Sequence, residues 1–383
     1  MDKIMPSRRT FIKYGLIVAG MATIPVVAQY AKRYDIPGLS AKPDSNGLLL
    51  PPNATSRIIA RSGYTVEKSD YIWHSAPDGG GVIGTDSGGW IYTSNSEMKN
   101  AGGGVGAIRF SKHGEIETAY SILSGSHRNC GGCFTPWGTW LSCEEINKGV
   151  TWECDPHGVK AAEAKPALGL FKHESIIFDP DSFILYLTED KGDSGFYRYI
   201  PDSVKKGKAD LNQGVLEIAL VNNKGDVTWE RITDPQAKQT PLRHQVKGNA
   251  KFNGGEGIVY RDGSIYFDTK GDDRVWEYKI SSGKMSIFYD AADYEKPVLT
   301  GVDTIAVLKD HLLICEDDGD MQIVAISPQK EIKPILQLTG HDKSEITGLA
   351  FSPDKKRLYF NSQRGETGKS RDAVTYEVMG EFV

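Results

Sequence analysis

A cysteine followed directly by two glutamates is the segment of this 383-residue chain best suited to chemistry. Cys143, Glu144 and Glu145 follow a Thr-Pro-Trp-Gly-Thr-Trp segment, which predicts a turn and a short strand over residues 139–142. Side chains alternate along a strand, so the thiol and both carboxylates can gather at one sheet edge only where the ladder ends. A soft sulfur beside hard oxygens suits a metal ion. The alternative is a buried cysteine beside two solvated acids.

The chain has five cysteines, an odd number. In an oxidising compartment at least one thiol would therefore remain free or bind a metal. Cys130-Gly-Gly-Cys133 is typical of a disulfide or of half a zinc site, but no second Cys-x-x-Cys completes a zinc ribbon. We therefore expect Cys143, which is flanked by acids, to be the metal-binding thiol.

Composition favours a turn-rich globular β protein. Hydrophobic residues make up 39% of the chain, and glycine (42) and tyrosine (17) are abundant. The net charge is −5, and no basic stripe runs along any segment. Nucleic acid is therefore not an expected partner.

The N-terminus predicts an export signal. The segment Ser7-Arg8-Arg9-Thr10-Phe11-Ile12-Lys13 precedes an apolar run over 14–28, which is the pattern of a twin-arginine signal peptide. The run is shorter than the ~20 residues of a membrane span, so we expect membrane contact only through an uncleaved signal. The predicted partner is the twin-arginine export machinery, and the predicted location is the periplasm or the exterior.

A repeat of about 45 residues follows a predicted linker and lead-in over 29–65. Each unit has an apolar strand, a turn, a second strand rich in Tyr, Phe, Leu and Ile, and a polar cluster. The steps between clusters are 47, 45, 79, 48 and 45 residues when the markers are Glu97, Glu144, Glu189, Asp268, Glu316 and Asn361. This period predicts a six-bladed β-propeller, all-β, as one domain over 66–383, with extra strand and loop in the long step. A β-sandwich without a repeat is the alternative.

Several of the predicted hairpins begin and end with acids. A hairpin returns its chain to the edge where it began, so both ends lie on one face. If these hairpins are the inner strands, their acids converge on the propeller axis, where so many like charges require multivalent cations. The candidate metal ligands are Cys143, Glu144, Glu145, Glu174, Glu189, Asp190, Glu256, Asp303, Glu316 and Glu345.

These segments resemble the PhoX-type alkaline phosphatases. The resemblance rests on the twin-arginine signal, Asn129-Cys-Gly-Gly132, the Thr135-to-Glu145 segment, Thr188-Glu-Asp190, Cys315-Glu-Asp317 and Ser352-Pro-Asp354. It implies a propeller with two axial ferric ions (Fe3+) bridged by a cysteine thiolate, surrounded by Ca2+, that hydrolyses small phosphate esters. It further implies Cys143 as the bridge, with Cys143 and Glu256 as the predicted catalytic pair.

One position departs from the family pattern. Relatives carry an arginine two residues before the glutamate of the fourth repeat, where a guanidinium could hold phosphate by two hydrogen bonds. Here that position is Gly254. Lys251, Lys270, Arg274 and Arg364 are the basic residues that could replace it, although a lysine is only a point charge.

The sequence is also compatible with two other functions. Six-bladed propellers with axial calcium also serve as lactonase-type hydrolases. An exported propeller with structural metals could instead bind a partner without catalysis, because fold alone does not decide function.

Overall fold

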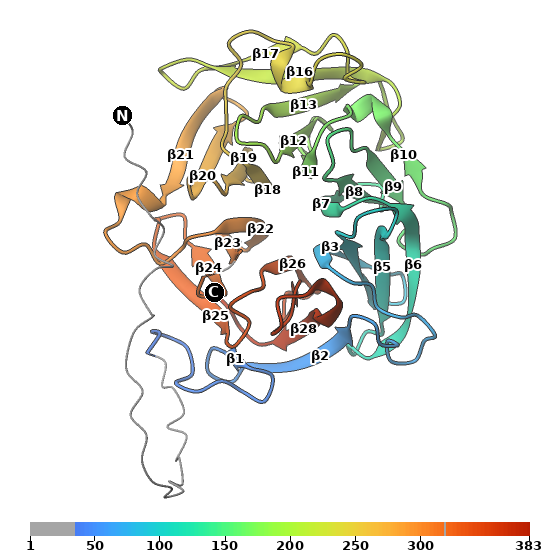
Figure 1. Ribbon diagram of the computed structural model, residues 1–383, viewed down its shortest axis with the longest axis vertical. Helices are drawn as coiled ribbons and strands as arrows, with labels where there is room; N and C mark the ends of the chain where they lie inside the picture. Colours follow the sequence, from blue (N-terminus) through green and yellow to red (C-terminus); the bar gives the residue numbers. More distant parts are fainter. Residues whose placement is uncertain (1–34, 318) are drawn as a thin grey trace, which may run out of the picture. The chain divides into compact units, whose positions relative to one another are not determined.

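Six antiparallel sheets form the fold of the described chain. The computed structural model describes residues 35–383 except 318, and the predicted export signal lies outside these residues. The innermost strand of each sheet contacts the innermost strands of the two neighbouring sheets, and together they form a closed ring (Figure 1). The described residues contain no α-helix and only short 3-10 turns. The predicted six-bladed β-propeller is thus confirmed.

The blades follow one another along the chain. The first comprises β3 (Pro77–Gly84), β4 (Trp90–Ser96), β5 (Gly103–Phe110) and β6 (Ile116–Ser126), and the second β7 (Asn129–Phe134), β8 (Trp140–Glu144), β9 (Thr151–Cys154) and β10 (Glu163–Ala164). The third comprises β11 (His173–Phe178), β12 (Leu185–Glu189), β13 (Phe196–Pro201), β16 (Gly214–Val221) and β17 (Val227–Arg231). The fourth comprises β18 (Gly255–Arg261), β19 (Ser264–Thr269), β20 (Arg274–Lys279) and β21 (Lys284–Asp290).

The last two blades each take their outermost strand from the start of the described chain. The fifth comprises β22 (Val302–Leu308), β23 (His311–Glu316), β24 (Gln322–Ile326), β25 (Ile332–Leu338) and β1 (Leu48–Leu49). The sixth comprises β26 (Ile346–Phe351), β27 (Arg357–Ser362), β28 (Val374–Met379) and β2 (Thr55–Arg61). The expected lead-in over 29–65 therefore needs correction, because residues 48–61 pair with C-terminal strands and close the ring.

The third blade accounts for the long step in the repeat. It has a fifth strand, β17, and a separate hairpin of β14 (Val204–Lys205) and β15 (Lys208–Ala209) follows β13. The extra strand and loop expected between residues 190 and 255 are confirmed.

Strand alternation explains how neighbouring blades pack. On β4, Tyr92 contacts the sixth blade, where its ring stacks on Tyr359 with centroids 5.2 Å apart. The preceding residue of the same strand, Ile91, belongs to the apolar cluster that contains Trp140 of the second blade. Successive side chains of one strand thus fill the two adjoining interfaces, as the period of two requires.

A buried ion-pair network holds the closing strand. Glu377 of β28 accepts hydrogen bonds from Arg57 of β2 (Nε to Oε1, 2.9 Å) and from Arg357 of β27 (Nη1 to Oε1, 2.7 Å). Tyr359 donates its hydroxyl to the other carboxylate oxygen at 2.9 Å. The Glu377 side chain is 3% exposed, so its charge depends on these partners.

We expect Glu377→Gln to lower the free energy of unfolding by about 3 kcal/mol, because it leaves two arginines without their buried counter-ion. The measurement is the thermal unfolding midpoint. Glu117→Gln is the matched control, since the Arg109–Glu117 pair on exposed outer strands is half solvated and worth less than about 1 kcal/mol. Equal shifts in the two variants would contradict this account of the closure.

Candidate metal centre on the propeller axis

All six inner strands carry an irregularity at the same place. Pairing with the second strand shifts register just inside the start of each inner strand, and the displaced residues face the axis as in a β-bulge. The shifts lie between Pro77 and Gly80, Asn129 and Gly132, His173 and Ile176, Gly255 and Ile258, Val302 and Ile305, and Thr347 and Ala350.

One residue near the start of each inner strand belongs to what we call the inner ring; these residues are displaced in the first five blades, whereas the one in the sixth is still paired. Each directly follows the inner-strand residue at which pairing with the second strand begins. The inner ring consists of Asp78, Cys130, Glu174, Glu256, Asp303 and, in the sixth blade, Thr347, all of them buried. A narrow cavity of about 50 Å³ on the axis is lined by residues that include Asp78, Glu174 and Asp303.

A second set, the outer ring, comes from the residues that follow the second strands. The last paired residues there are Ser96, Glu144, Glu189, Thr269, Glu316 and Ser362. The next residue in each blade approaches the inner ring. The outer ring is Glu97, Glu145, Asp190, Lys270, Asp317 and Gln363.

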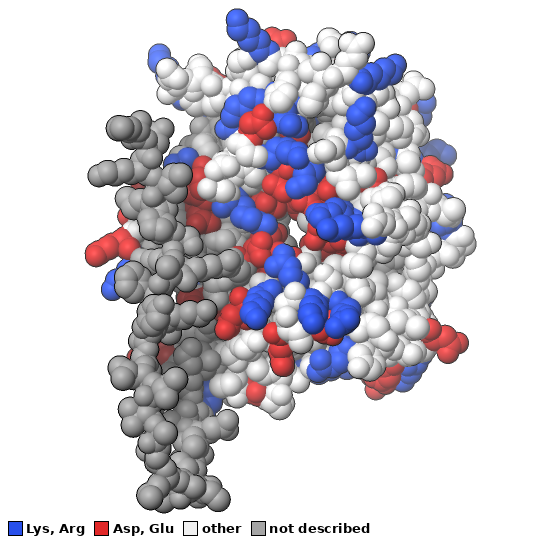
Figure 2. All heavy atoms as spheres, viewed as in Figure 1, with Lys and Arg blue, Asp and Glu red and all other residues white. Residues whose placement is uncertain are grey.

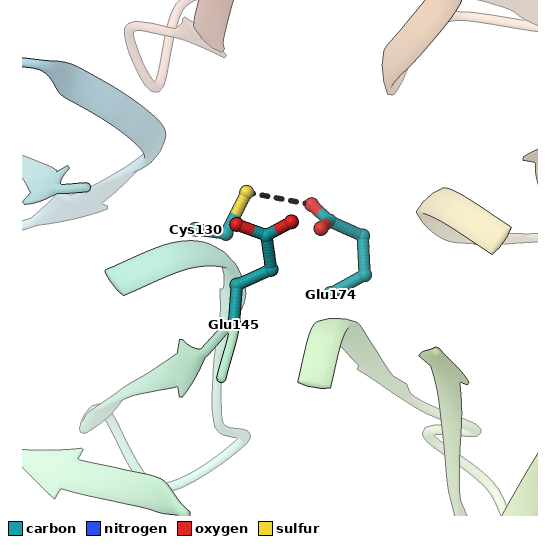
Figure 3. Close-up of side chains that lie close together, drawn as sticks. All are labelled: Cys130, Glu145 and Glu174. Atoms are coloured by element: carbon teal, nitrogen blue, oxygen red, sulfur yellow. Dashed lines mark hydrogen bonds between the residues drawn. The ribbon is translucent and has the colours of Figure 1, made fainter. Parts of the chain in front are cut away.

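A thiol lies among the acids of the two rings. Cys130 Sγ donates to Glu174 Oε1 at 2.8 Å, and Glu145 points into the same space from the end of β8 (Figure 3). The possible ligand atoms of these three residues lie within 4.8 Å of one another. Two further groups meet the same criterion, namely Asp78 with Glu97 and Glu345, and Asp303 with Asp317 and Glu345.

The negative charge at the mouth exceeds its fixed counter-charge. Arg128 Nη1 contacts Glu97 (2.8 Å) and Glu145 (3.3 Å), while Lys172 Nζ contacts Glu145 (2.7 Å) and Asp190. Figure 2 shows basic side chains around a hollow in which acidic ones gather. With Glu345 the rings contain nine carboxylates, and the basic residues paired with them are Arg128, Lys172, Lys270 and Arg364.

Comparison with known proteins places this arrangement in a family. A family model described as alkaline phosphatase PhoX matches residues 82–155 and 147–296, more than half of the chain. The chain belongs to the PhoX family of alkaline phosphatases. No curated protein sequence matches it significantly.

Solved structures confirm the fold. Pseudomonas fluorescens PhoX in complex with vanadate, a transition state analogue, aligns with a TM-score of 0.72 at 15% identity, over 87% of this chain and 96% of that one. A gluconolactonase from Xanthomonas campestris aligns with a TM-score of 0.52 at 8% identity, over 86% and 90% of the two chains. A Bacteroides thetaiotaomicron protein of unknown function also aligns with a TM-score of 0.52, at 10% identity, over 85% and 76%.

The structure places Cys143, the predicted metal-binding thiol of this PhoX-family chain, away from the propeller axis. Cys143 is fully buried in an apolar cluster with Leu141, Phe171 and Cys133, and the polar atom near its sulfur is Thr151 Oγ1 at 3.9 Å. The same cluster includes Ile176 of β11 in the third blade, so Cys143 faces the neighbouring blade and not the axis. Cys130 occupies the inner ring instead. The five cysteines are all free and buried, so the proposed Cys130–Cys133 disulfide is absent.

Three predicted ligands do not reach the mouth, because each is the residue before the one that does. Glu144 accepts hydrogen bonds from the backbone N–H groups of His127 (2.9 Å) and Val150 (3.2 Å), and Glu316 does the same for Thr300 (3.2 Å) and Gln322 (2.9 Å). Glu189 accepts from Gly195 N and from Arg243. These carboxylates hold the loops around the strand ends. Their successors Glu145, Asp190 and Asp317 are the residues that reach the outer ring.

The other predicted metal ligands do lie at the mouth, but the predicted set is incomplete. Of the predicted ligands, Glu145, Glu174, Asp190, Glu256, Asp303 and Glu345 do meet at the mouth. Sequence reasoning missed Asp78, Glu97, Asp317 and the role of Cys130. These residues share a position in the repeat: each is the second residue of an inner strand or the first residue after a second strand. Aligning the six repeats by strand register makes this shared position visible.

The basic residues proposed to replace the missing arginine do not share one location. Arg274 pairs with Asp272 and Asp290 on the fourth blade, and Lys251 Nζ donates to Arg243 O in an exposed loop. Arg364 does reach the mouth, where Nη2 contacts Glu345 at 2.8 Å. Gly254 has φ +75°, and a Cβ there would lie 3.4 Å from Asp190 Oδ1, so any side chain at this position would start beside the acids but in a strained backbone.

The donor set fits a metal cation. Glu174 Oε2 is buried without a hydrogen-bond partner. Burial, reinforced by the charges of Glu256 and Glu145, raises the pKa of Glu174 well above its usual value. Burial likewise raises the pKa of the Cys130 thiol. Only a nearby positive charge would keep this thiol and these carboxylates ionised together, and a bound cation supplies it.

We expect Cys130→Ser to remove transition metal from the natively exported protein, and Cys143→Ser to leave the metal content unchanged. The first substitution takes away the thiolate among the acids, whereas the second changes only an apolar interface. Elemental analysis per chain is the measurement. Metal loss in Cys143→Ser with metal retained in Cys130→Ser would instead make Cys143 the metal-binding thiol.

Acid–base behaviour gives a second prediction, for the metal-free protein. Burial, with the charge of Glu97, raises the pKa of Glu145 from its usual 4.5 to about 8. The folded state therefore holds protons that the unfolded state releases between these values, so the free energy of unfolding falls as pH rises from about 4.5 to about 8.

The unfolding midpoint of chelator-treated protein should accordingly decrease from pH 5 to pH 8, and added metal should reduce this slope because it takes the place of the protons. Glu145→Gln should show a shallower decrease than the parent chain. A midpoint that rises over this range in the metal-free protein would disprove the expected protonation.

Proposed function

We propose that this chain is an exported, metal-dependent phosphoesterase that hydrolyses small phosphate esters at the propeller axis. The observation that carries the proposal is the buried Cys130–Glu145–Glu174 group at the centre of a PhoX-family fold. The predicted twin-arginine signal supports export, with a periplasmic or secreted location. No helix among the described residues is long and apolar enough to cross a membrane.

The chemistry of each group suggests its metal. Thiolate with carboxylate favours iron, so we assign ferric iron to Cys130, Glu145 and Glu174, with Glu256 from the next blade as a further ligand. Oxygen donors without sulfur favour calcium, so we assign Ca2+ to Asp78, Glu97 and Glu345. Bound in these places, such cations supply Lewis-acid polarisation of the phosphoryl oxygens.

Arg128 is the residue that we assign to substrate binding. It directly precedes Asn129, the first residue of β7, and this is the place that Gly254 occupies before β18 in the fourth blade. Its Nη1 contacts Glu97 and Glu145, whereas Nε and Nη2 make no hydrogen bond with any described residue. The side chain is 32% exposed, so these free donors can reach a phosphate at the mouth.

Lys172 occupies the same place before β11 in the third blade. Its Nζ binds Glu145 and Asp190, and an ammonium group has one further N–H to donate. Arg128 and Lys172 thus lie on either side of Glu145, which fixes both cations beside the thiol. A dianionic phosphate group would meet two positive side chains there in place of the arginine that the chain lacks at Gly254.

The proposal is tested by assaying natively exported protein on an aryl phosphate, with an aryl ester and a lactone as comparison substrates. We expect aryl phosphate hydrolysis, and Arg128→Gln should lower kcat/KM for it by about 10- to 100-fold, the range for losing a charged hydrogen bond. Arg109→Gln, which breaks an exposed ion pair on the first blade, is the matched control and should leave kcat/KM unchanged.

Lactone turnover by protein that contains calcium alone would instead favour the lactonase-type alternative. Metal-loaded protein that hydrolyses none of the three substrates would favour a non-catalytic binding role. Either result would overturn the phosphoesterase proposal.

A further inference from the structure

Lys270 differs in charge from every other residue of the outer ring. The equivalent positions of the other five blades hold an acid or an amide, namely Glu97, Glu145, Asp190, Asp317 and Gln363. The fourth blade therefore brings a positive charge to a place where its neighbours bring an oxygen ligand.

The Lys270 ammonium is surrounded by carboxylates. Its Nζ lies 2.9 Å from Asp303 Oδ2, 3.0 Å from Asp317 Oδ2 and 3.5 Å from Glu256 Oε1. These acids are largely buried, with side chains between 4% and 18% exposed. The two shorter contacts are within hydrogen-bonding distance and the third is longer, so the ammonium is held chiefly between Asp303 and Asp317.

Arg364 adds a second charge to the same group of acids. Its Nη2 lies 2.8 Å from Glu345 Oε2 and its Nη1 lies 3.4 Å from Asp317 Oδ1. Asp303, Asp317 and Glu345 have oxygens within 4.8 Å of one another, a separation that would suit a divalent ion. Unlike Glu174, none of the three has a buried side-chain oxygen that lacks a partner.

We propose that the Lys270 ammonium is the resident cation of the Asp303–Asp317–Glu345 group, so that a tethered side chain occupies the place where this group could otherwise hold a divalent metal ion. Calcium takes six to eight oxygen ligands at 2.3–2.6 Å, and it could collect the three carboxylates only after displacing Lys270 from Asp303 and Asp317. The inference concerns the cation content of the mouth alone, and it stands whether or not the chain hydrolyses phosphate esters.

An ammonium group in place of a divalent metal ion changes the chemistry of these acids. A divalent ion would contribute two charges and open coordination positions, whereas an ammonium contributes one charge and no coordination position. The Asp303–Asp317–Glu345 group is therefore held together without Lewis acidity. This separates it from the Cys130 group, where an unpartnered Glu174 oxygen remains available to a metal.

Calcium titration of Lys270→Met tests the proposal, since methionine removes the charge at similar length. The matched control is Lys284→Met. At the start of β21, the outermost strand of the fourth blade, this variant breaks a half-exposed ion pair with Asp226. Calorimetry and elemental analysis should show one more calcium per chain in Lys270→Met than in the parent, and none gained in Lys284→Met. The gain should disappear in Lys270→Met/Asp317→Asn, which lacks one of the ligands.

Equal calcium stoichiometry in the parent and in Lys270→Met would overturn the proposal. If Lys270→Met does not fold, a crystal structure of the parent chain at millimolar calcium decides. The proposal expects Lys270 Nζ between Asp303 and Asp317 with no ion in that place. A calcium ion bound to Asp303, Asp317 and Glu345, with the lysine turned away, would refute it.

Discussion

The concentration of buried negative charge on the axis is the constraint on which the rest of this structure depends. Asp78, Glu174, Glu256 and Glu345 are at most 4% exposed, and Asp78 and Glu174 line one narrow cavity together with Asp303. Isolated charges cannot be buried at such density in a medium of low dielectric constant. The buried negative charge can be reduced by proton uptake, by a basic side chain from a neighbouring blade, or by a metal ion bound to a suitable donor set.

Strand alternation divides the polar residues between two tasks. Where a second strand ends, one acid turns back to bind the backbone of the adjoining loops, as Glu144 and Glu316 do. The next acid, Glu145 or Asp317, reaches the mouth. The loop-binding acid holds the strand end in place, and this positions the mouth residue that follows. In the second, third and fifth blades the position of the mouth acid therefore depends on the loop-binding carboxylate before it, namely Glu144, Glu189 or Glu316.

Much of the architecture follows from the sequence, because the repeat of about 45 residues reports the blade directly. The register at the strand ends is harder to predict, since a single residue separates Glu144 from Glu145 and the two have the same chemistry. The acids that follow Cys143 in sequence favour it as a ligand, yet its side chain packs against the third blade. The spacing of Cys130 and Cys133 indicates a possible pair, and only the bulge in β7 shows that Cys130 faces the axis. The closing strands β1 and β2 escaped prediction because they pair with residues about 300 positions away.

Anomalous diffraction at the iron absorption edge, from crystals of the natively exported protein, tests most directly whether the axial thiol of Cys130, together with Glu145 and Glu174, holds a transition metal. We expect a peak within bonding distance of Cys130 Sγ and of carboxylate oxygens of Glu145 and Glu174. A peak beside Cys143, or metal-loaded crystals with no peak near Cys130, would contradict it.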